Sequence, residues 1–232
     1  MAVEPGDPAR YTLRAGDDRL PLDSLLGEPL RLAWSGAIAC TNCGRATRKS
    51  FGQGHCYPCF KRLARCDTCI MKPELCHYFQ GTCREPEWGE STAFSPHRLP
   101  GQCLRPQGRD YPRHPGADPL ARPGAVQALP ILEVDSRQQS GFVEMLFKGE
   151  VSDRTNWRAM LKGETPELDL AAERDRLFAQ LASGLDALRE RFGESTIRPV
   201  EAAPRTFTYP VLEYPTKVVS HNFDKRAEVA GR

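Results

Sequence analysis

Apolar residues recur at several different spacings along this chain, and each spacing predicts a different kind of element. In residues 164–193, leucines and phenylalanines return every three or four positions, which predicts an amphipathic helix. Thr165 followed by proline is typical of a helix start, and Gly193 is typical of a helix end. An apolar stripe of this kind indicates packing against a core rather than a cofactor site.

Shorter patterns on both sides of this helix predict strands. Residues 11–39 and 128–134 read as strands, and a helix is expected to follow over residues 136–148. Residues 205–220 read as strands interrupted by two prolines, whereas residues 84–97 look acidic and irregular.

Eight of the nine cysteines fall close together in the sequence, which indicates a metal-binding segment in addition to the helices and strands. A two-residue gap between cysteines lets one tight turn point both sulfurs at the same ion, and two such pairs complete a tetrahedral Zn²⁺ site. The first set has the spacing of a zinc ribbon: Cys40, Cys43, Cys56 and Cys59. Gly44 follows its second cysteine, where the backbone is expected to be left-handed. We expect the metal to fold this segment.

A second set of cysteines follows with less regular spacing: Cys66, Cys69, Cys76 and Cys83. It predicts a second Zn²⁺, hence two per chain, although His55 or His77 could replace a cysteine if the pairing differs. An iron–sulfur cluster is an alternative, because four thiolates also suit one. Disulfides are not expected, because the N-terminus carries no export signal.

The cysteine-rich segment is also basic. Between Cys40 and Arg84, eight basic residues are opposed by two acidic ones, and aromatic residues are interleaved with them. Cations bind phosphates and flat rings stack on bases, so this composition predicts contact with nucleic acid. The candidate residues are Arg45, Arg48, Lys49, Lys61, Arg62 and Arg65. The alternative is that the cations only screen the thiolates while the rings form a small core.

The remaining composition limits the class of protein. The chain has 232 residues, of which 40% are apolar and 27% charged, enough for one large domain or two small ones. No apolar run is long enough to span a membrane, so we expect a cytoplasmic protein with no membrane partner. Residues 98–124 hold six prolines and show no periodicity, which as written predicts an irregular linker.

Four motifs in the chain are long and distinctive. They are Cys56-Tyr-Pro-Cys-Phe-Lys, Gln80-Gly-Thr-Cys-Arg-Glu-Pro-Glu-Trp-Gly-Glu, Arg137-Gln-Gln-Ser-Gly-Phe-Val-Glu and Asp153-Arg-Thr-Asn-Trp-Arg. Together they resemble an uncharacterised bacterial family, the domain of unknown function numbered 2797. The resemblance covers roughly residues 20–97 and 124–226, and it implies no established activity.

Between these two parts the chain departs from the family pattern. Family members carry V-Y-L-A-N followed by K-V-G-I-T, where this chain has Arg98-Leu-Pro-Gly-Gln-Cys. Codons for these residues, when read in the neighbouring frame, can encode the family motif. We therefore hypothesise that residues 98 to about 124 are a frame-shifted translation, so that Cys103 is a by-product and not a ligand.

The family motif is in turn similar to the core of GIY-YIG-type nucleases. The resemblance implies that Glu144 holds a catalytic Mg²⁺, with Asn156 a possible further match. The tyrosine and arginine of such a core would fall in the shifted segment, so we expect this chain to be inactive as an enzyme. The alternative for Glu144 is a solvent-facing helix residue.

These observations predict an α+β protein, in which a small zinc-ribbon-like cysteine-rich module joins a mixed α/β domain disrupted at 98–124. The expected parts are N-terminal strands (1–36), the double zinc module (37–92), a degraded GIY-YIG-like segment (93–163), the amphipathic helix (164–193) and C-terminal strands, expected to be truncated (194–232). The leading function is a zinc-binding protein that contacts nucleic acid. The alternatives are a metal-dependent nuclease and a protein-interaction scaffold held together by zinc.

Overall fold

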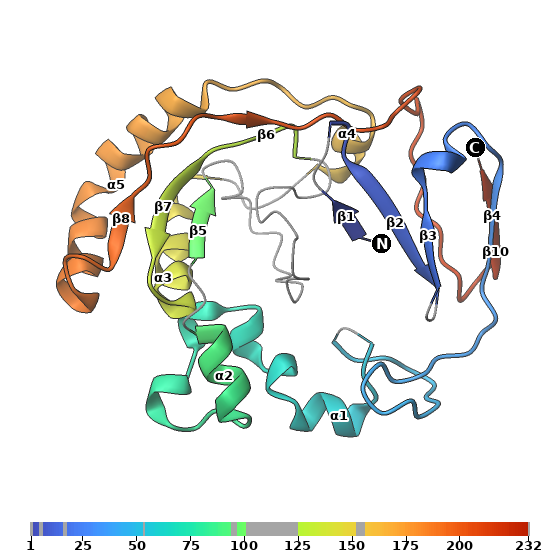
Figure 1. Cartoon of the computed structure of the whole chain (residues 1–232), viewed down its shortest axis with the longest axis horizontal. Helices are drawn as coiled ribbons and strands as arrows, with labels where there is room; N and C mark the ends of the chain where they lie inside the picture. Colours follow the sequence, from blue (N-terminus) through green and yellow to red (C-terminus); the bar gives the residue numbers. More distant parts are fainter. Residues whose placement is uncertain are drawn as a thin grey trace.

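The computed structural model describes residues 2–4, 7–15, 18–52, 54–93, 97–100, 125–151 and 156–231. Helices and strands are mixed along the described chain, and the strand pairs are antiparallel. The predicted α+β class is therefore confirmed. Figure 1 shows the described elements arranged in a ring, with α3 and α5 on one side and β2, β3 and β4 on the other.

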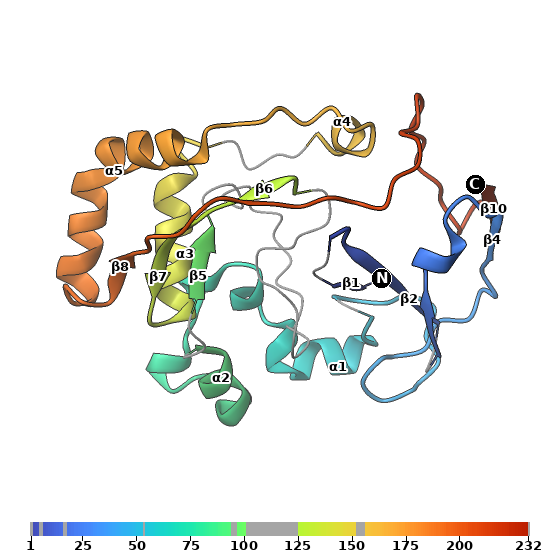
Figure 2. The ribbon, with the colours of Figure 1, turned by 45° about the horizontal axis from the view of Figure 1, so that its top comes forward.

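The larger hydrophobic core lies between a three-stranded sheet and two helices. The sheet has the order β5 (His97–Pro100), β7 (Pro130–Val134), β8 (Ile197–Pro199), and α3 (Arg137–Phe147) and α5 (Leu170–Phe192) pack beside it (Figures 1 and 2). Four of the five residues of β7 are buried, as expected for a central strand. Val143 and Phe147 of α3 join this core, as do the buried leucines of α5.

The ends of both helices follow from local capping chemistry. Ser136 and Gln139 form a reciprocal capping box at the start of α3, which confirms the helix expected there. Asp169 caps α5 by accepting hydrogen bonds from two backbone N–H groups, so the start expected at Thr165 is wrong. The expected end is confirmed, because Gly193 follows the last helical residue with a φ of 109°.

The N-terminal strands form two small sheets. β1 (Ala2–Glu4), β2 (Arg10–Ala15) and β3 (Asp18–Pro21) make one, while β4 (Leu30–Ala33) pairs with β10 (Glu228–Gly231) in the other (Figure 2). In the second sheet, β10 lies antiparallel to β4, and Nη2 of Arg31 lies 2.6 Å from Oε2 of Glu228 in an ion pair.

Two other expectations fail for identifiable reasons. β6 (Gln127–Ala128) pairs with β9 (Arg205–Thr206), but the strands expected over the rest of 205–220 do not form. Prolines in that stretch lack the N–H groups that a ladder needs. The segment expected to be irregular at 84–97 contains α2 (Pro86–Ala93), whose first residue is a proline, as helix starts allow.

The cysteine-rich segment is built from short turns. It contains α1 (Tyr57–Arg62) and four 3₁₀ turns, at Ala64–Cys66, Thr68–Ile70, Pro73–Leu75 and Tyr78–Gln80. Farther along, α4 (Trp157–Leu161) precedes α5. Of the segment expected to be irregular, residues 98–100 belong to β5, and residues 101–124 with Cys103 lie outside the described residues. No helix in the described part is long and apolar enough to cross a membrane.

Candidate metal centre and basic surface

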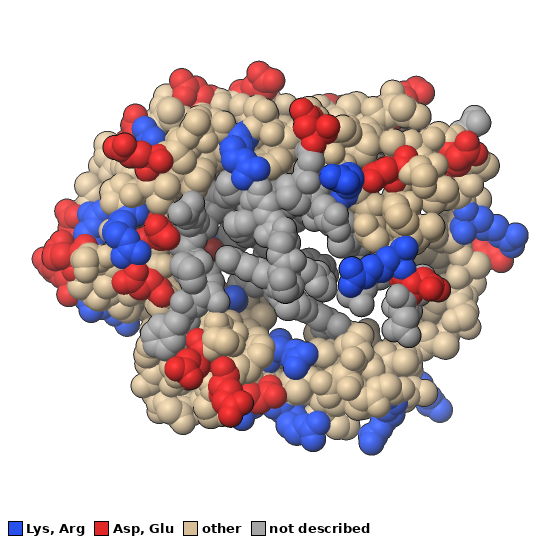
Figure 3. Space-filling view, in the orientation of Figure 1, with Lys and Arg blue, Asp and Glu red and all other residues tan. Residues whose placement is uncertain are grey.

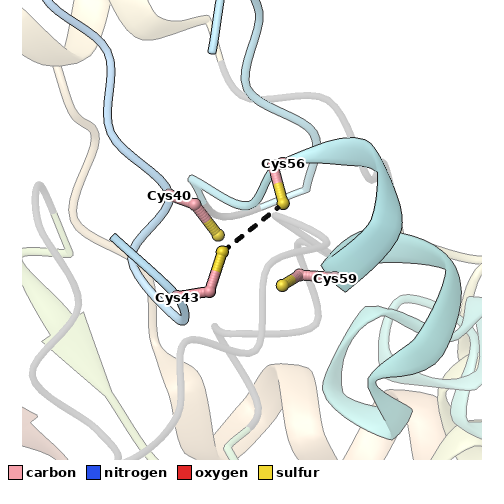
Figure 4. Close-up of side chains that lie close together, drawn as sticks. All are labelled: Cys40, Cys43, Cys56 and Cys59. Atoms are coloured by element: carbon pink, nitrogen blue, oxygen red, sulfur yellow. Dashed lines mark hydrogen bonds between the residues drawn. The ribbon is translucent and has the colours of Figure 1, made fainter. Parts of the chain in front are cut away.

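The first set of cysteines converges on one point. The sulfurs of Cys40, Cys43, Cys56 and Cys59 all lie within 4.8 Å of one another, and Figure 4 shows them pointing toward a common centre. The Sγ atoms of Cys43 and Cys56 are 3.7 Å apart. Three of the four residues are buried and Cys43 is exposed. This cluster could hold a metal ion.

Two tight loops bring these sulfurs together. In the first, Ala39 bridges to Ala46, and Gly44 donates its N–H to the Cys40 carbonyl with a φ of 69°, as the sequence predicted. In the second, Phe51 bridges to His55 just before Cys56. Both loops resemble the knuckles of a zinc ribbon, with the second cysteine pair entering a helix at α1.

The loops also contact each other directly. Thr41 donates its N–H to the Gly54 carbonyl at 2.9 Å, and its hydroxyl lies 3.1 Å from Nδ1 of His55. His55 is buried, and its ring nitrogen Nδ1 is hydrogen-bonded with the Thr41 hydroxyl. Although the sequence left His55 open as a substitute ligand, it is not part of the sulfur cluster.

Hydrogen bonds from backbone donors and burial shift the pKa values of the thiols in this cluster in opposite directions. Hydrogen bonds from the backbone, above all from Cys56, lower the pKa of Cys40 to about 5. Burial, together with hydrogen bonding to Cys56 and Cys43, raises the pKa of Cys59 to about 12. The side chain of Cys40 is therefore a thiolate at neutral pH, whereas Cys59 keeps its proton until a bound cation displaces that proton.

The second set of cysteines is not gathered in the same way. Cys66 packs against the first cluster, and Cys83 donates its S–H to the Glu85 carbonyl at 3.5 Å. The thiols of Cys69 and Cys76 lie close enough that their interaction raises the pKa of Cys69 and lowers the pKa of Cys76. The four thiols of the predicted set therefore do not form one cluster with all sulfurs within 4.8 Å of one another in the described structure.

A different group of ligand types lies at that place. Asp67, Cys69 and His77 have their ligand atoms within 4.8 Å of one another, and all three are partly buried. The sequence flagged His77 but missed Asp67. Its position inside the motif Cys66-Asp-Thr-Cys was the available signal, since a carboxylate between two cysteines can also face the ion.

The six candidate basic residues all lie on the surface. Each is exposed, and none forms an ion pair with another residue in the described ranges. Figure 3 shows basic side chains along the edge of the molecule that carries α1, with acidic side chains gathered beside them over α2. The ring of Tyr57 is 54% exposed on the same helix as Lys61 and Arg62.

The residues implied by the nuclease resemblance lie apart from these groups. Glu144 is half-buried on α3 and belongs to no cluster of metal-ligating side chains among the described residues. Asn156 caps α4 by accepting the Ala159 N–H at 3.2 Å. The roles implied for both residues stay predictions.

The chain belongs to a family of uncharacterised proteins. The model of the family described as "Protein of unknown function (DUF2797)" matches residues 27–99 and 120–232, which is most of the chain. The unmatched interval falls within the segment where the sequence departs from the family pattern. No curated protein and no solved structure matches the chain.

Proposed function

We propose that this protein binds Zn²⁺ through Cys40, Cys43, Cys56 and Cys59, and that the basic surface around this ion contacts nucleic acid. The observation that carries the proposal is the convergence of four sulfurs within 4.8 Å of one another. Four sulfurs and no nitrogen or oxygen ligand favour a thiophilic ion such as zinc over Mg²⁺ or Ca²⁺.

The spacing of the sulfurs suits a tetrahedral zinc ion. A Zn–S bond of about 2.3 Å places neighbouring sulfurs about 3.8 Å apart in a regular tetrahedron. The sulfurs of Cys43 and Cys56, at 3.7 Å, lie close to that value. Asn42 donates from Nδ2 to the sulfur of Cys59 at 3.5 Å, a contact of the kind that orients and stabilises a thiolate ligand.

The charge and shape of the surface near this site support a nucleic-acid partner. Six exposed cations without ion-pair partners in the described part of the chain are available to phosphates. Tyr57 and Lys61 are one helical turn apart on α1, so an exposed ring and a cation share one face. Phe51 packs edge-on against Tyr57 at 5.3 Å, which fixes the ring in place for stacking.

Elemental analysis of the purified protein tests the metal. Zinc is expected in the native chain, and Cys40→Ser should lose the ion of this site because a hydroxyl is a poor substitute for thiolate. Iron with visible absorption would instead establish the cluster alternative. If the native chain contains no metal and Cys40→Ser leaves the metal content unchanged, the proposal is contradicted.

The salt dependence of binding tests the nucleic-acid surface. A double variant, Lys49→Gln with Lys61→Gln, should weaken binding to duplex DNA and lower the slope of log K against log salt by about 1.8, that is, about 0.9 for each lost phosphate contact. Lys217→Gln with Lys225→Gln removes the same charge from exposed positions elsewhere and is the matched control. Equal effects of the two pairs, or binding independent of salt, would favour the scaffold alternative.

A further inference from the structure

Cys69, Cys76, Asp67 and His77 gather beside the N-terminal end of α3. Asp67, Cys69 and His77 have ligand atoms within 4.8 Å of one another, and the thiol of Cys76 lies next to that of Cys69. We propose that these four side chains form a second zinc site of mixed ligands, separate from the first. Two sulfurs, one imidazole nitrogen and one carboxylate oxygen make a tetrahedral set that zinc accepts.

The hydrogen bonds of His77 leave the right nitrogen open toward this site. The Thr82 hydroxyl donates to the His77 carbonyl at 3.3 Å, so its oxygen is available to accept from Nδ1–H of the imidazole at 2.8 Å. In the neutral ring the proton is then on Nδ1, and the lone pair on Nε2 faces Asp67 Oδ2 at 3.6 Å. Two lone pairs that face each other repel, and a cation between them turns this repulsion into attraction.

The surroundings balance the charge of such a site. Two thiolates and a carboxylate carry one more negative charge than a zinc ion neutralises. Arg84 compensates, because its Nη2 lies 3.3 Å from Asp67 Oδ2. The buried Arg137 adds a second positive charge near Cys69 and Cys76.

Helix α3 also holds the ligand loop in position through two hydrogen bonds. Arg137 donates from Nη2 to the carbonyl of Ile70, the neighbour of Cys69, at 2.6 Å. Gln138 donates from Nε2 to the carbonyl of Cys76 at 2.8 Å. The loop is therefore fixed at both cysteines by the core domain, as a preorganised site requires.

Two cysteines of the same segment serve as matched controls. Cys66 packs against the first cluster, and Cys83 lies against α2, where an added Cβ on Gly89 would meet its sulfur at 2.7 Å. Both are thiols within the same twenty residues, but neither belongs to the mixed group. A serine at either position should leave the second ion bound.

Zinc content of the full-length protein and its single variants tests the proposal. The native chain should hold about two zinc ions, and Cys69→Ser and His77→Gln should each lower this to about one. Cys66→Ser and Cys83→Ser should keep about two. If the controls lose an ion while Cys69→Ser and His77→Gln do not, the proposal is overturned.

The same measurement separates failure here from failure of the first site. The native chain could instead hold about one zinc ion, which is lost in Cys40→Ser and kept in Cys69→Ser. That result would overturn this proposal and leave the first site standing. About one zinc with the opposite dependence would support this proposal and reject the first site, and no zinc would overturn both.

X-ray absorption at the zinc edge of the unmutated protein is a check that does not depend on the variants folding. A four-sulfur site and a two-sulfur site average to about three sulfurs and one nitrogen or oxygen per ion. A first shell of sulfur alone, with two ions per chain, would overturn the mixed ligand set.

Discussion

Gly141 lies at a close contact between the cysteine-rich segment and the core domain. It lies buried in the middle of α3, against the 3₁₀ turn Pro73–Leu75. A Cβ added there would lie 2.3 Å from the backbone nitrogen of Glu74 and 2.8 Å from the carbonyl carbon of Pro73. These are backbone atoms, so no side-chain rotation can make room, and Gly141→Ala must push the helix and the turn apart.

The size of the effect follows from two opposing terms. Alanine in place of glycine inside a helix ordinarily stabilises by about 1 kcal/mol. Overpacking a buried contact costs about 1–3 kcal/mol, and we take the upper end because the obstacle is backbone. The net loss is then about 2 kcal/mol of unfolding free energy, equivalent to a fall in Tm of about 4–8 °C for a chain of this length.

Thermal and denaturant unfolding, followed by circular dichroism, measure this change. Gly149→Ala is the control, because the nearest atom to its added Cβ is a carbonyl oxygen at an ordinary 3.9 Å, and its stability should equal or slightly exceed that of the native chain. If Gly141→Ala is as stable as Gly149→Ala, the close packing of the turn on α3 is refuted.

The variant also bears on the second metal site. The turn that Gly141→Ala displaces lies between Cys69 and Cys76 in the sequence. We therefore expect weaker binding of the second zinc ion and no change at the first, measured by competition with a chelator. Equal weakening at both ions would instead indicate general unfolding.

Three further predictions concern protons, stacking and catalysis. Because the pKa of Cys59 is raised to about 12, its thiol is protonated at neutral pH, so zinc binding should release protons and weaken as pH falls. Titration calorimetry in buffers of different ionisation enthalpy measures this proton release, and a result of no release would contradict the prediction. Tyr57→Ala should cost single-stranded nucleic-acid binding about 1–3 kcal/mol by loss of stacking, whereas Tyr57→Phe should cost little in the same binding assay. In a chain whose segment 98–124 is restored to the neighbouring frame, Mg²⁺-dependent cleavage should appear and Glu144→Ala should abolish it; cleavage that survives Glu144→Ala would reject the role of this carboxylate.

The family match bears on the altered segment as well. Matching stops at residue 99 and resumes at residue 120, close to the limits set by the codon comparison. β5, which ends at Pro100, pairs with the central strand β7. Resequencing this stretch of the gene should reveal the family motif in the neighbouring frame.

Features that depend on local physics could be predicted from the amino-acid sequence. The spacing of Cys40, Cys43, Cys56 and Cys59 predicted a converging cluster because two-residue gaps fix the geometry of a turn, whatever surrounds it. The amphipathic period predicted α5, since burial of one face requires it, although the start was misplaced. Thr165-Pro matched a helix start equally well, and only the hydrogen bonds of Asp169 show which cap is used.

Features that depend on contacts between distant segments became visible only in the folded chain. β10 forms only because β4 offers it a partner, about two hundred residues earlier in the chain, and no local pattern encodes that pairing. Likewise, cysteine spacing suggested that Cys66 and Cys83 act with Cys69 and Cys76. The packing of α3 on the turn at Pro73–Leu75 instead leaves Cys69 and Cys76 beside Asp67 and His77, because irregular gaps leave side-chain direction to the tertiary contacts.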